Sequence, residues 1–347
     1  MDRIRLIRIL PAIAFLLLAA AIFHSDERTS SAQQAAFAQD ESEQETEDIQ
    51  GKTSISVAVD LVSLQVLVTD KKGNVILGLK PENFKLYEDD VEQEISHFST
   101  VKASITAVML VEYSRQVQYF INDVWNSMYG FAATLRPDDW VAVVGYDMKP
   151  TILCDFTRDR QKLYDALRRF TIPVFDDSNL SDALIDTLDR VEEIEGKVAI
   201  ILISTGLDTF SRHTYEEALD KCKESDASVY AISLGQYFRL RAEAAGIISN
   251  LGNIELLMAD NRLRSFADYT GGFAYFPRFE TELPTIFSNI SQLLRSQYSI
   301  AYASTNTKKD GKYRKVRVEV NSELTDVKGK PLKLQAHTRK GYLPRTL

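Results

Sequence analysis

The chain has 347 residues, of which 45% are hydrophobic and 26% charged, so it can bury a core and is long enough for two domains. Its net charge of −8 argues against a general nucleic-acid binder, because neutralising phosphates requires a basic surface. Two cysteines and four well-separated histidines exclude a disulfide-rich scaffold, a cysteine-rich zinc site and a histidine-cluster metalloenzyme.

Residues 1–38 have the pattern of a secretory signal peptide or an N-terminal membrane anchor. Three arginines precede an apolar run at residues 9–23, which is short for a spanning helix, and Ala-Phe-Ala at residues 36–38 fits a cleavage site. Cleavage and retention both stay open. Either outcome places the rest of the chain outside the cytoplasm, in a secreted, periplasmic or cell-envelope location. A retained anchor would be its only expected contact with a membrane.

Residues 39–52 read as an acidic flexible linker. The stretch DESEQETED holds six acids and no base, and large apolar side chains are almost absent around it. Such a composition buries too little surface to offset the entropy of ordering the chain.

Residues 53–104 read as short antiparallel strands separated by turns rich in Gly, Asn and Asp. The expected strands cover residues 54–69, 75–79, 84–87 and 94–98. This segment is too small for a sandwich of its own.

Residues 105–297 alternate continuous apolar strands with amphipathic helices. The strands are expected at residues 107–111, 141–145, 151–156, 198–204, 229–234 and 273–276. The helices are expected at residues 119–135, 158–170, 180–194, 215–225 and 283–294. This alternation predicts a doubly wound, mostly parallel sheet covered on both faces, with a ligand crevice at the carboxyl ends of its strands. Residues 236–264 are long for a connection and predict either a binding loop or an extra packed helix at 242–258.

Residues 298–347 return to β structure, with strands expected at 298–303, 313–320 and 332–338. We expect the two flanking segments to pair into one small β-sandwich, with the α/β domain inserted between them. The alternating Lys312, Arg314, Lys315 and Arg317 predict a solvated strand face.

Two further residues are assigned no function. Cys154 and Cys222 are expected to be buried and unpaired with each other.

The expected strand ends gather polar residues at the crevice. They are Glu112, Tyr113, Ser114, Arg115 and Gln116 after the first strand, Asp147 after the second, Asp176, Asp177 and Ser178 before a helix, and Thr205 and Asp208 after the most apolar strand. Together with DKKGNVILGLKPENFKLYEDD, LRSFADYTGG and HTRKGY, these stretches resemble a von Willebrand factor A (VWA) domain. More narrowly, they resemble the secreted acidobacterial-type VWFA-related proteins of largely unassigned function. The resemblance covers about residues 61–342.

The resemblance implies a metal-ion-dependent adhesion site, in which Asp-x-Ser-x-Ser, a Thr and a second Asp hold Mg²⁺ and leave a position for a partner's carboxylate. Glu112 stands at the first Asp, Gln116 at the second Ser and Thr205 at the final Asp. Ser114 is retained, and Ser178 stands where the Thr is expected.

These departures predict a degenerate site and no cofactor, because Mg²⁺ requires strict geometry and Thr205 removes a negative charge. The alternative is a rebuilt cation site that would take Ca²⁺ more readily than Mg²⁺. Its ligands would be Glu112, Ser114, Ser178, Asp208, and Asp176 or Asp177.

The expected function is non-enzymatic, extracytoplasmic binding of a protein partner at this crevice. The residues expected to border the binding face are Tyr113, Arg115, Asp147, Asp176 and Asp177. An enzyme is not expected, since Ser114 has no activating base in sequence reach. The alternative function is a structural or assembly subunit of a cell-envelope complex that uses the β-sandwich edge or residues 236–264.

Overall fold

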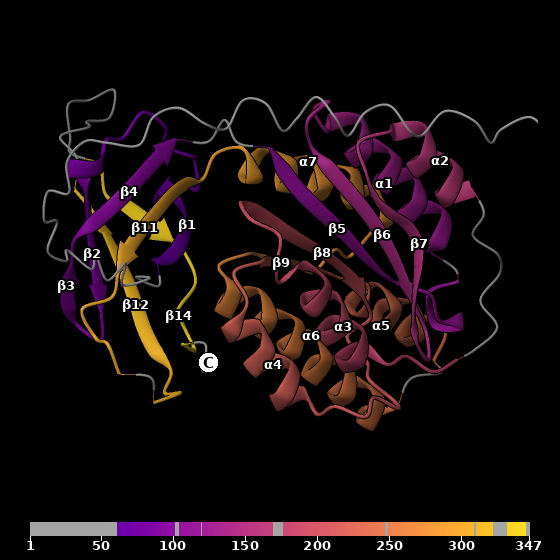
Figure 1. The fold of residues 1–347 in the computed structure, drawn as a ribbon. Coiled ribbons are helices and arrows are strands. Elements are labelled where there is room, and N and C mark those ends of the chain that lie inside the picture. Colours follow the sequence, from indigo (N-terminus) through magenta and orange to yellow (C-terminus); the bar gives the residue numbers. More distant parts are fainter. Residues whose placement is uncertain are drawn as a thin grey trace, which may run out of the picture. The chain divides into compact units, whose positions relative to one another are not determined.

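The structure is a computed structural model, and it describes residues 61–100, 104–118, 120–168, 176–246, 249–308, 310–321 and 332–344 (Figure 1). The predicted signal or anchor and the acidic linker lie outside these residues. None of the described helices is long and apolar enough to cross a bilayer.

The central sheet has six strands in the order β10-β9-β8-β5-β6-β7. They are β5 (Ile105–Glu112), β6 (Trp140–Tyr146), β7 (Pro150–Thr157), β8 (Lys197–Ser204), β9 (Ser228–Ser233) and β10 (Ala274–Tyr275). All neighbours are parallel except β7, which pairs with β6 in the antiparallel sense. Every residue of β5 and β8 is buried, which explains their unbroken apolar sequences.

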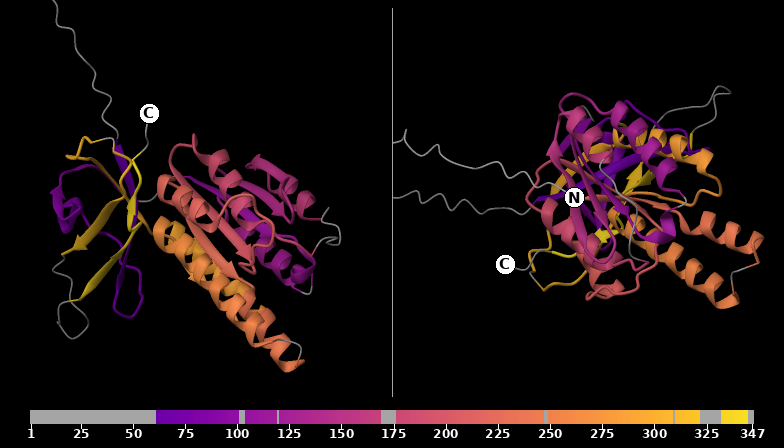
Figure 2. Two further views of the ribbon diagram at one scale, coloured as in Figure 1. Left: turned by 90° about the horizontal axis from the view of Figure 1, so that it is seen from below. Right: turned by 90° about the vertical axis from the view of Figure 1, so that its right-hand side faces the viewer.

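Helices cover both faces of this sheet (Figures 1 and 2). One face packs against α1 (Ile121–Thr134), α2 (Arg160–Arg168) and α7 (Leu283–Leu294), and the other against α3 (Leu180–Val191), α4 (Tyr215–Glu224) and α6 (Asn250–Thr270). Alternate residues of β5 enter the two cores, so that Met109 packs on one side and Leu110 on the other. The predicted doubly wound α/β fold is confirmed. A further helix, α5 (Gly235–Ala244), precedes α6.

The remaining strands form two antiparallel four-stranded sheets. The first has the order β13-β1-β11-β4 and consists of β1 (Leu61–Asp70), β4 (Ile95–Thr100), β11 (Tyr298–Ala303) and β13 (Leu334–His337). The second has the order β14-β12-β2-β3 and consists of β2 (Phe84–Glu88), β3 (Val91–Gln93), β12 (Arg314–Val320) and β14 (Gly341–Tyr342). Inward side chains of both sheets share a third hydrophobic core. Each sheet thus combines strands from before and after the α/β region, while the domain boundaries stay a prediction.

Short 3₁₀ turns complete the list of elements. They are η1 (Pro81–Asn83), η2 (Arg115–Val117) and η3 (Glu280–Glu282). Cys154 and Cys222 are buried and free, as predicted.

Two local predictions were wrong. Residues 75–79 form no strand beyond a single bridge at Val75, because the Tyr298 hydroxyl bonds the Ile76 carbonyl and the Leu79 amide there. Arg314 does not face solvent: its side chain is 6% exposed, since it lies on the same inward face of β12 as Val316.

Residues 236–264 contain two helices, and the second continues to Thr270.

The HTRKGY stretch packs against the LRSFADYTGG stretch at the end of α6. Arg339 is buried and donates hydrogen bonds to the carbonyls of Lys223 (2.6 Å) and Gly341 (2.9 Å) and to Asp226 (3.0 Å). Gly271 ends α6 at φ +76°, and a Cβ there would lie 2.5 Å from the Arg339 nitrogen. Two stretches far apart in the sequence therefore depend on each other for packing.

Candidate functional site

The carboxyl ends of three neighbouring strands place polar side chains together. Glu112 ends β5, Tyr146 ends β6 and Ser204 ends β8, and Glu112 and Tyr146 are register partners. Because parallel strands end at one edge of the sheet, these residues lie at the crevice that the fold predicts.

Glu112 is the centre of a buried hydrogen-bond network. Its Oε1 accepts from Ser114 Oγ (2.7 Å), and its Oε2 accepts from Ser204 Oγ (2.9 Å), Thr205 N (2.6 Å) and Thr205 Oγ1 (2.8 Å). The Tyr146 hydroxyl donates to Ser204 Oγ at 2.8 Å. We call these five residues the Glu112 cluster. All five side chains are at most 1% exposed.

Burial raises the pKa of the Glu112 carboxyl, and the hydrogen bonds from Ser114, Thr205 and Ser204 oppose that shift only in part. Burial also raises the pKa of Tyr146. Ser114 does touch a carboxylate, but both groups are closed off from solvent. The pair is therefore not arranged as a nucleophile and base open to a substrate.

Asp208 lies outside the Glu112 cluster. Its Oδ2 accepts from the backbone N (3.0 Å) and Oγ (2.5 Å) of Ser181 in the first turn of α3, and its Oδ1 accepts from Ser211 N. A carboxylate at a helix N-terminus satisfies free amides and interacts favourably with the helix dipole. Asp208 thus fixes the start of α3 against the loop after β8.

The other predicted residues, apart from the buried Ser178, form the outer rim. Arg115 and Asp176 make an exposed ion pair at 3.4 Å, and Gln116 Nε2 donates to the Asp176 carbonyl. The backbone carbonyl of Asp147 accepts a hydrogen bond from the backbone amide of Asn179. Tyr113 and Asp177 are half-buried. Ser178 is fully buried, and its amide bonds Thr209 Oγ1 at 3.0 Å.

In this geometry the two oxygens of the Glu112 carboxyl are not free for Mg²⁺ or Ca²⁺. The cluster holds one carboxylate, both of whose oxygens already accept hydrogen bonds, and the carboxylates of Asp208 and Asp176 are engaged elsewhere. Hard cations need several oxygens free to coordinate. Across the part of the chain that the structure describes, no group of three or more His, Cys, Asp or Glu is placed to hold a metal ion.

Sequence reasoning missed several residues of this region. Tyr146 and Ser204 are the last residues of their strands, so the rule that located Glu112 would also have found them. Met148 and Phe210, which are 43% and 69% exposed, lie on the loops after β6 and β8 and carried no motif.

The rim loops are tied to one another. Asn179 Nδ2 donates to the Met148 carbonyl (2.8 Å), and Thr209 N donates to the Ser178 carbonyl (2.8 Å). We call four exposed side chains of these loops the crevice face. They are Arg115, Met148, Asp176 and Phe210.

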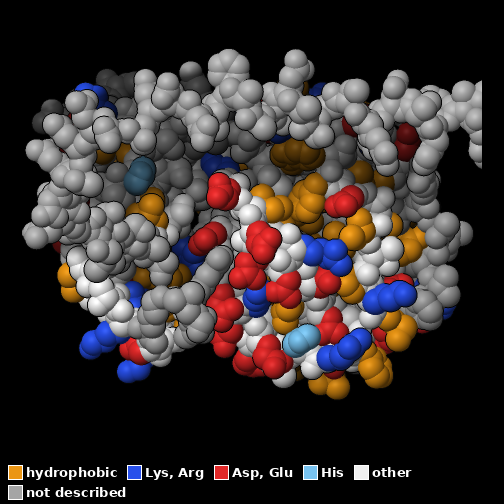
Figure 3. Space-filling view, in the orientation of Figure 1, with side chains coloured by type: hydrophobic (Ala, Val, Ile, Leu, Met, Phe, Trp, Pro, Cys, Tyr) orange, Lys and Arg blue, Asp and Glu red, His pale blue; other side chains and the backbone are white. Residues whose placement is uncertain are grey.

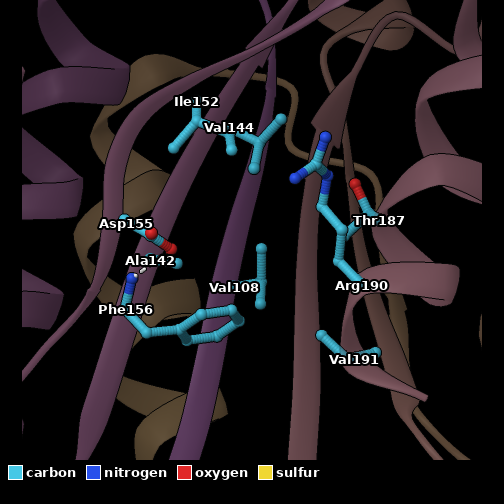
Figure 4. Close-up of a pocket in the computed structure, with 9 residues that line it drawn as sticks. All are labelled: Val108, Ala142, Val144, Ile152, Asp155, Phe156, Thr187, Arg190 and Val191. Carbon is cyan, nitrogen blue, oxygen red and sulfur yellow. Dashed lines mark hydrogen bonds between the residues drawn. The ribbon is translucent and has the colours of Figure 1, made fainter. Parts of the chain in front are cut away.

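A separate pocket of about 170 Å³ lies between the sheet and α3 (Figure 4). Its lining residues are Val108, Ala142, Val144, Ile152, Asp155, Phe156, Thr187, Arg190 and Val191. Arg190 is held by Asp186 at 2.6 Å, and Asp155 accepts the Phe156 amide at 2.8 Å. None of the predicted site residues lines this pocket.

No protein-family model matches the chain, and no curated protein sequence matches it. Among solved structures, it is similar to proximal thread matrix protein 1 of the mussel byssus with a zinc-occupied MIDAS motif, at 12% identity and a TM-score of 0.44. That match covers 56% of this chain and 49% of the mussel protein, about half its length.

Two bacterial structures are similar as well. The vWF domain of the type V pili tip protein Mfa5 from Porphyromonas gingivalis is 15% identical, with a TM-score of 0.43 and coverage of 56% of this chain and 95% of that one. The von Willebrand factor type A protein from Catenulispora acidiphila is 11% identical, with a TM-score of 0.45 and coverage of 74% and 72%. These identities are below 25% and the TM-scores below 0.5, so the chain is similar to these structures but is assigned no family or function by them.

Proposed function

We propose that this chain is a non-enzymatic, extracytoplasmic protein-binding module. Its VWA-like domain would dock a partner protein on the crevice face without a metal ion. The two sheets built from the flanking segments would act as the β-sandwich that carries this domain.

The proposal rests on one observation: the oxygens of the Glu112 carboxyl are occupied by hydrogen bonds from within the Glu112 cluster. In a metal-dependent adhesion site the cation supplies the contact to the partner, and its ligands must leave their oxygens free for it. In this chain four hydrogen bonds from Ser114, Ser204 and Thr205 occupy the carboxylate oxygens instead. The partner would therefore bind the rim rather than a bound ion.

The crevice face has the chemistry of a small protein interface. Phe210 and Met148 offer exposed apolar side chains, and Arg115 and Asp176 form an exposed ion pair. An apolar centre with a charged rim is the usual composition of such surfaces. The hydrogen bonds between the rim loops hold the face in one geometry, which reduces the entropy lost on binding.

The proposed location rests on the N-terminal sequence, which fits secretion or anchoring.

The test is a capture experiment from envelope extract with the purified chain as bait. The double variant Met148→Ser, Phe210→Ser removes the two apolar side chains of the crevice face. Leu77→Ser is the matched control, since Leu77 is 64% exposed and lies far from the crevice in the sequence and outside the α/β region.

We expect a specific partner to be captured by the wild type and by Leu77→Ser, with at least about tenfold less on the double variant. Capture should be the same in Mg²⁺ and in a chelator. Equal capture by all three proteins would remove the crevice face from the proposal, and loss of capture in chelator would show that a metal takes part.

A further inference from the structure

Helices α5 and α6 form an antiparallel pair that extends away from the central sheet (Figure 2). The helix α6 contacts β9 and β10, and the α6 side chains in the core that covers the sheet, Leu263, Phe266 and Ala267, come from its second half. The pair begins at Gly235, directly after β9, where a Cβ would lie 2.9 Å from the Thr205 carbonyl. The first half of α6 therefore stands out from the body of the domain.

The helix α6 is apolar on two faces. Its inner face buries Leu256, Leu263 and Phe266. Its outer face carries four apolar side chains that remain 49–65% exposed. These four residues, which we call the outer stripe, are Leu251, Ile254, Leu257 and Met258. Four of the twelve large hydrophobic side chains that are exposed in the described chain thus lie within eight residues of one helix.

The size and shape of the outer stripe argue against a second copy of this chain as its occupant. Four side chains of this kind, each about half exposed, present on the order of 300 to 400 Å² of apolar surface. A stable interface needs roughly 800 Å² per partner. The stripe is also a convex ridge, whereas the pocket of about 170 Å³ is large enough for only about one side chain.

The charge of the helix pair differs from that of the domain that carries it. Residues 105–297 contain 19 basic and 28 acidic residues, a net charge of −9. Residues 235–264 contain four arginines and three acids, a net charge of +1, and one of those acids, Asp260, is buried against Ser233. The pair therefore carries less negative charge than the domain as a whole.

Along the pair, the apolar outer stripe and the exposed acids Glu243 and Glu255 lie at the end, and arginines lie behind them. No lysine or arginine occurs in residues 242–261, and arginines stand on both sides of that stretch at 239, 241, 262 and 264. Arg241 and Arg264 are exposed. In the space-filling view, hydrophobic side chains gather at the lower right beside basic ones, while acidic side chains concentrate around α4 (Figure 3).

We propose that the outer stripe, together with Arg241 and Arg264, binds the surface of a lipid bilayer that contains anionic headgroups. Leu251 to Met258 extends about 10 Å along the helix. This length suits a contact with the headgroup region of a bilayer and is too short to cross the membrane. The apolar side chains enter the boundary between headgroups and acyl chains, and the arginines meet the phosphates. The acidic remainder of the domain stays on the water side.

This contact orients the domain on a membrane and is independent of the crevice face. It also adds a second membrane signal to any N-terminal anchor. A single weak membrane-binding element holds a protein on a bilayer only reversibly, whereas two such elements together hold it stably.

The experiment uses the full chain with an environment-sensitive fluorophore on a single introduced cysteine. Leu251→Cys reports the outer stripe, and Glu216→Cys on the exposed acidic side of α4 is the matched control. Cys154 and Cys222 are buried, so background labelling is measured on the unsubstituted chain. Because any N-terminal anchor is common to both variants, a difference between them belongs to the labelled position.

Vesicles of phosphatidylcholine alone and of phosphatidylcholine with phosphatidylglycerol are the two probes. We expect the label at 251 to gain at least about twofold in emission with the anionic vesicles, because it leaves water for an apolar medium. The gain should be smaller without phosphatidylglycerol and absent at 216. Adding Ile254→Ser and Met258→Ser should abolish it.

No change at 251 with either vesicle would overturn the proposal. So would a gain that follows protein concentration without vesicles, together with a doubled mass in sedimentation, because the occupant would then be a second copy. Equal gains at 251 and 216 would likewise contradict a specific contact.

Discussion

Replacing Arg314 by methionine is expected to lower the free energy of unfolding by about 3 to 5 kcal/mol. Arg314 and Glu88 form an ion pair at 3.4 Å inside the core between the two four-stranded sheets, with side chains only 6% and 1% exposed. Glu88 also accepts from the hydroxyls of Tyr302 (2.8 Å) and Tyr342 (3.0 Å). Removing the guanidinium leaves a buried carboxylate without its cation. An uncompensated buried charge strongly destabilises the folded state.

Arg317→Met is the matched control for this prediction. Arg317 lies on the same strand with its side chain 48% exposed, so its loss should change stability by no more than about 1 kcal/mol. Both values come from urea unfolding of the full chain. Equal destabilisation by the two variants would show that the Glu88–Arg314 pair does not hold the sheets together.

The second large effect concerns the Glu112 cluster. Glu112→Ala is expected to lower the free energy of unfolding by about 3 kcal/mol, because it leaves a cavity and strips the buried donors of Ser114, Ser204 and Thr205 of their acceptor. Glu112→Gln keeps the side-chain volume and one carbonyl acceptor. At acid pH it should therefore lower the free energy of unfolding by less than about 1 kcal/mol.

The pH dependence separates the charge of Glu112 from its shape. Burial raises the pKa of this carboxyl in the folded state above its unfolded value of 4.5. Its contribution to stability is therefore complete below about pH 4.5 and is lost as pH rises through the folded pKa. The free energy of unfolding of Glu112→Gln should therefore rise relative to that of the wild type between pH 4.5 and 8, as measured in parallel unfolding titrations. A difference that stays constant across this range would mean that Glu112 keeps an ordinary pKa.

Much of the α/β fold follows from the sequence, because strands buried on both faces must be apolar throughout. The runs at β5 and β8 were located on that basis. The amphipathic helix at Leu283–Leu294 was also predicted with the bounds that the structure has. Residues 75–79 show the limit of such patterns. Their apolar run fits a strand, but a tyrosine hydroxyl from β11 takes up the backbone groups that a neighbouring strand would need.

The position of Arg314 was also contained in the sequence. In the stretch RKVRVEV of β12, Arg314 alternates in phase with Val316 and Val318 and so belongs to the inward face. Its charge suggested solvent instead. What the strand alone could not show was the partner, Glu88, which lies 226 residues earlier and meets Arg314 only through the pairing of β2 with β12.

The crevice could be located from strand ends, but its internal bonding could not. The rule for parallel sheets brings Glu112, Ser114 and Thr205 to one edge. Whether their oxygens face a cation or each other depends on distances near 2.7 Å, which no residue pattern specifies. Asp208 illustrates this, since its place in the motif suggested a ligand while its carboxylate caps α3.

The proposal that the crevice binds its partner without a metal ion is tested most directly by calorimetric titration of the full chain with Mg²⁺, Ca²⁺ and Mn²⁺ up to millimolar concentration, with Glu112→Gln as control. We expect no saturable heat with any of the three ions, and identical traces for the two proteins. Saturable binding to the wild type that Glu112→Gln abolishes would contradict the proposal and place a cation at Glu112.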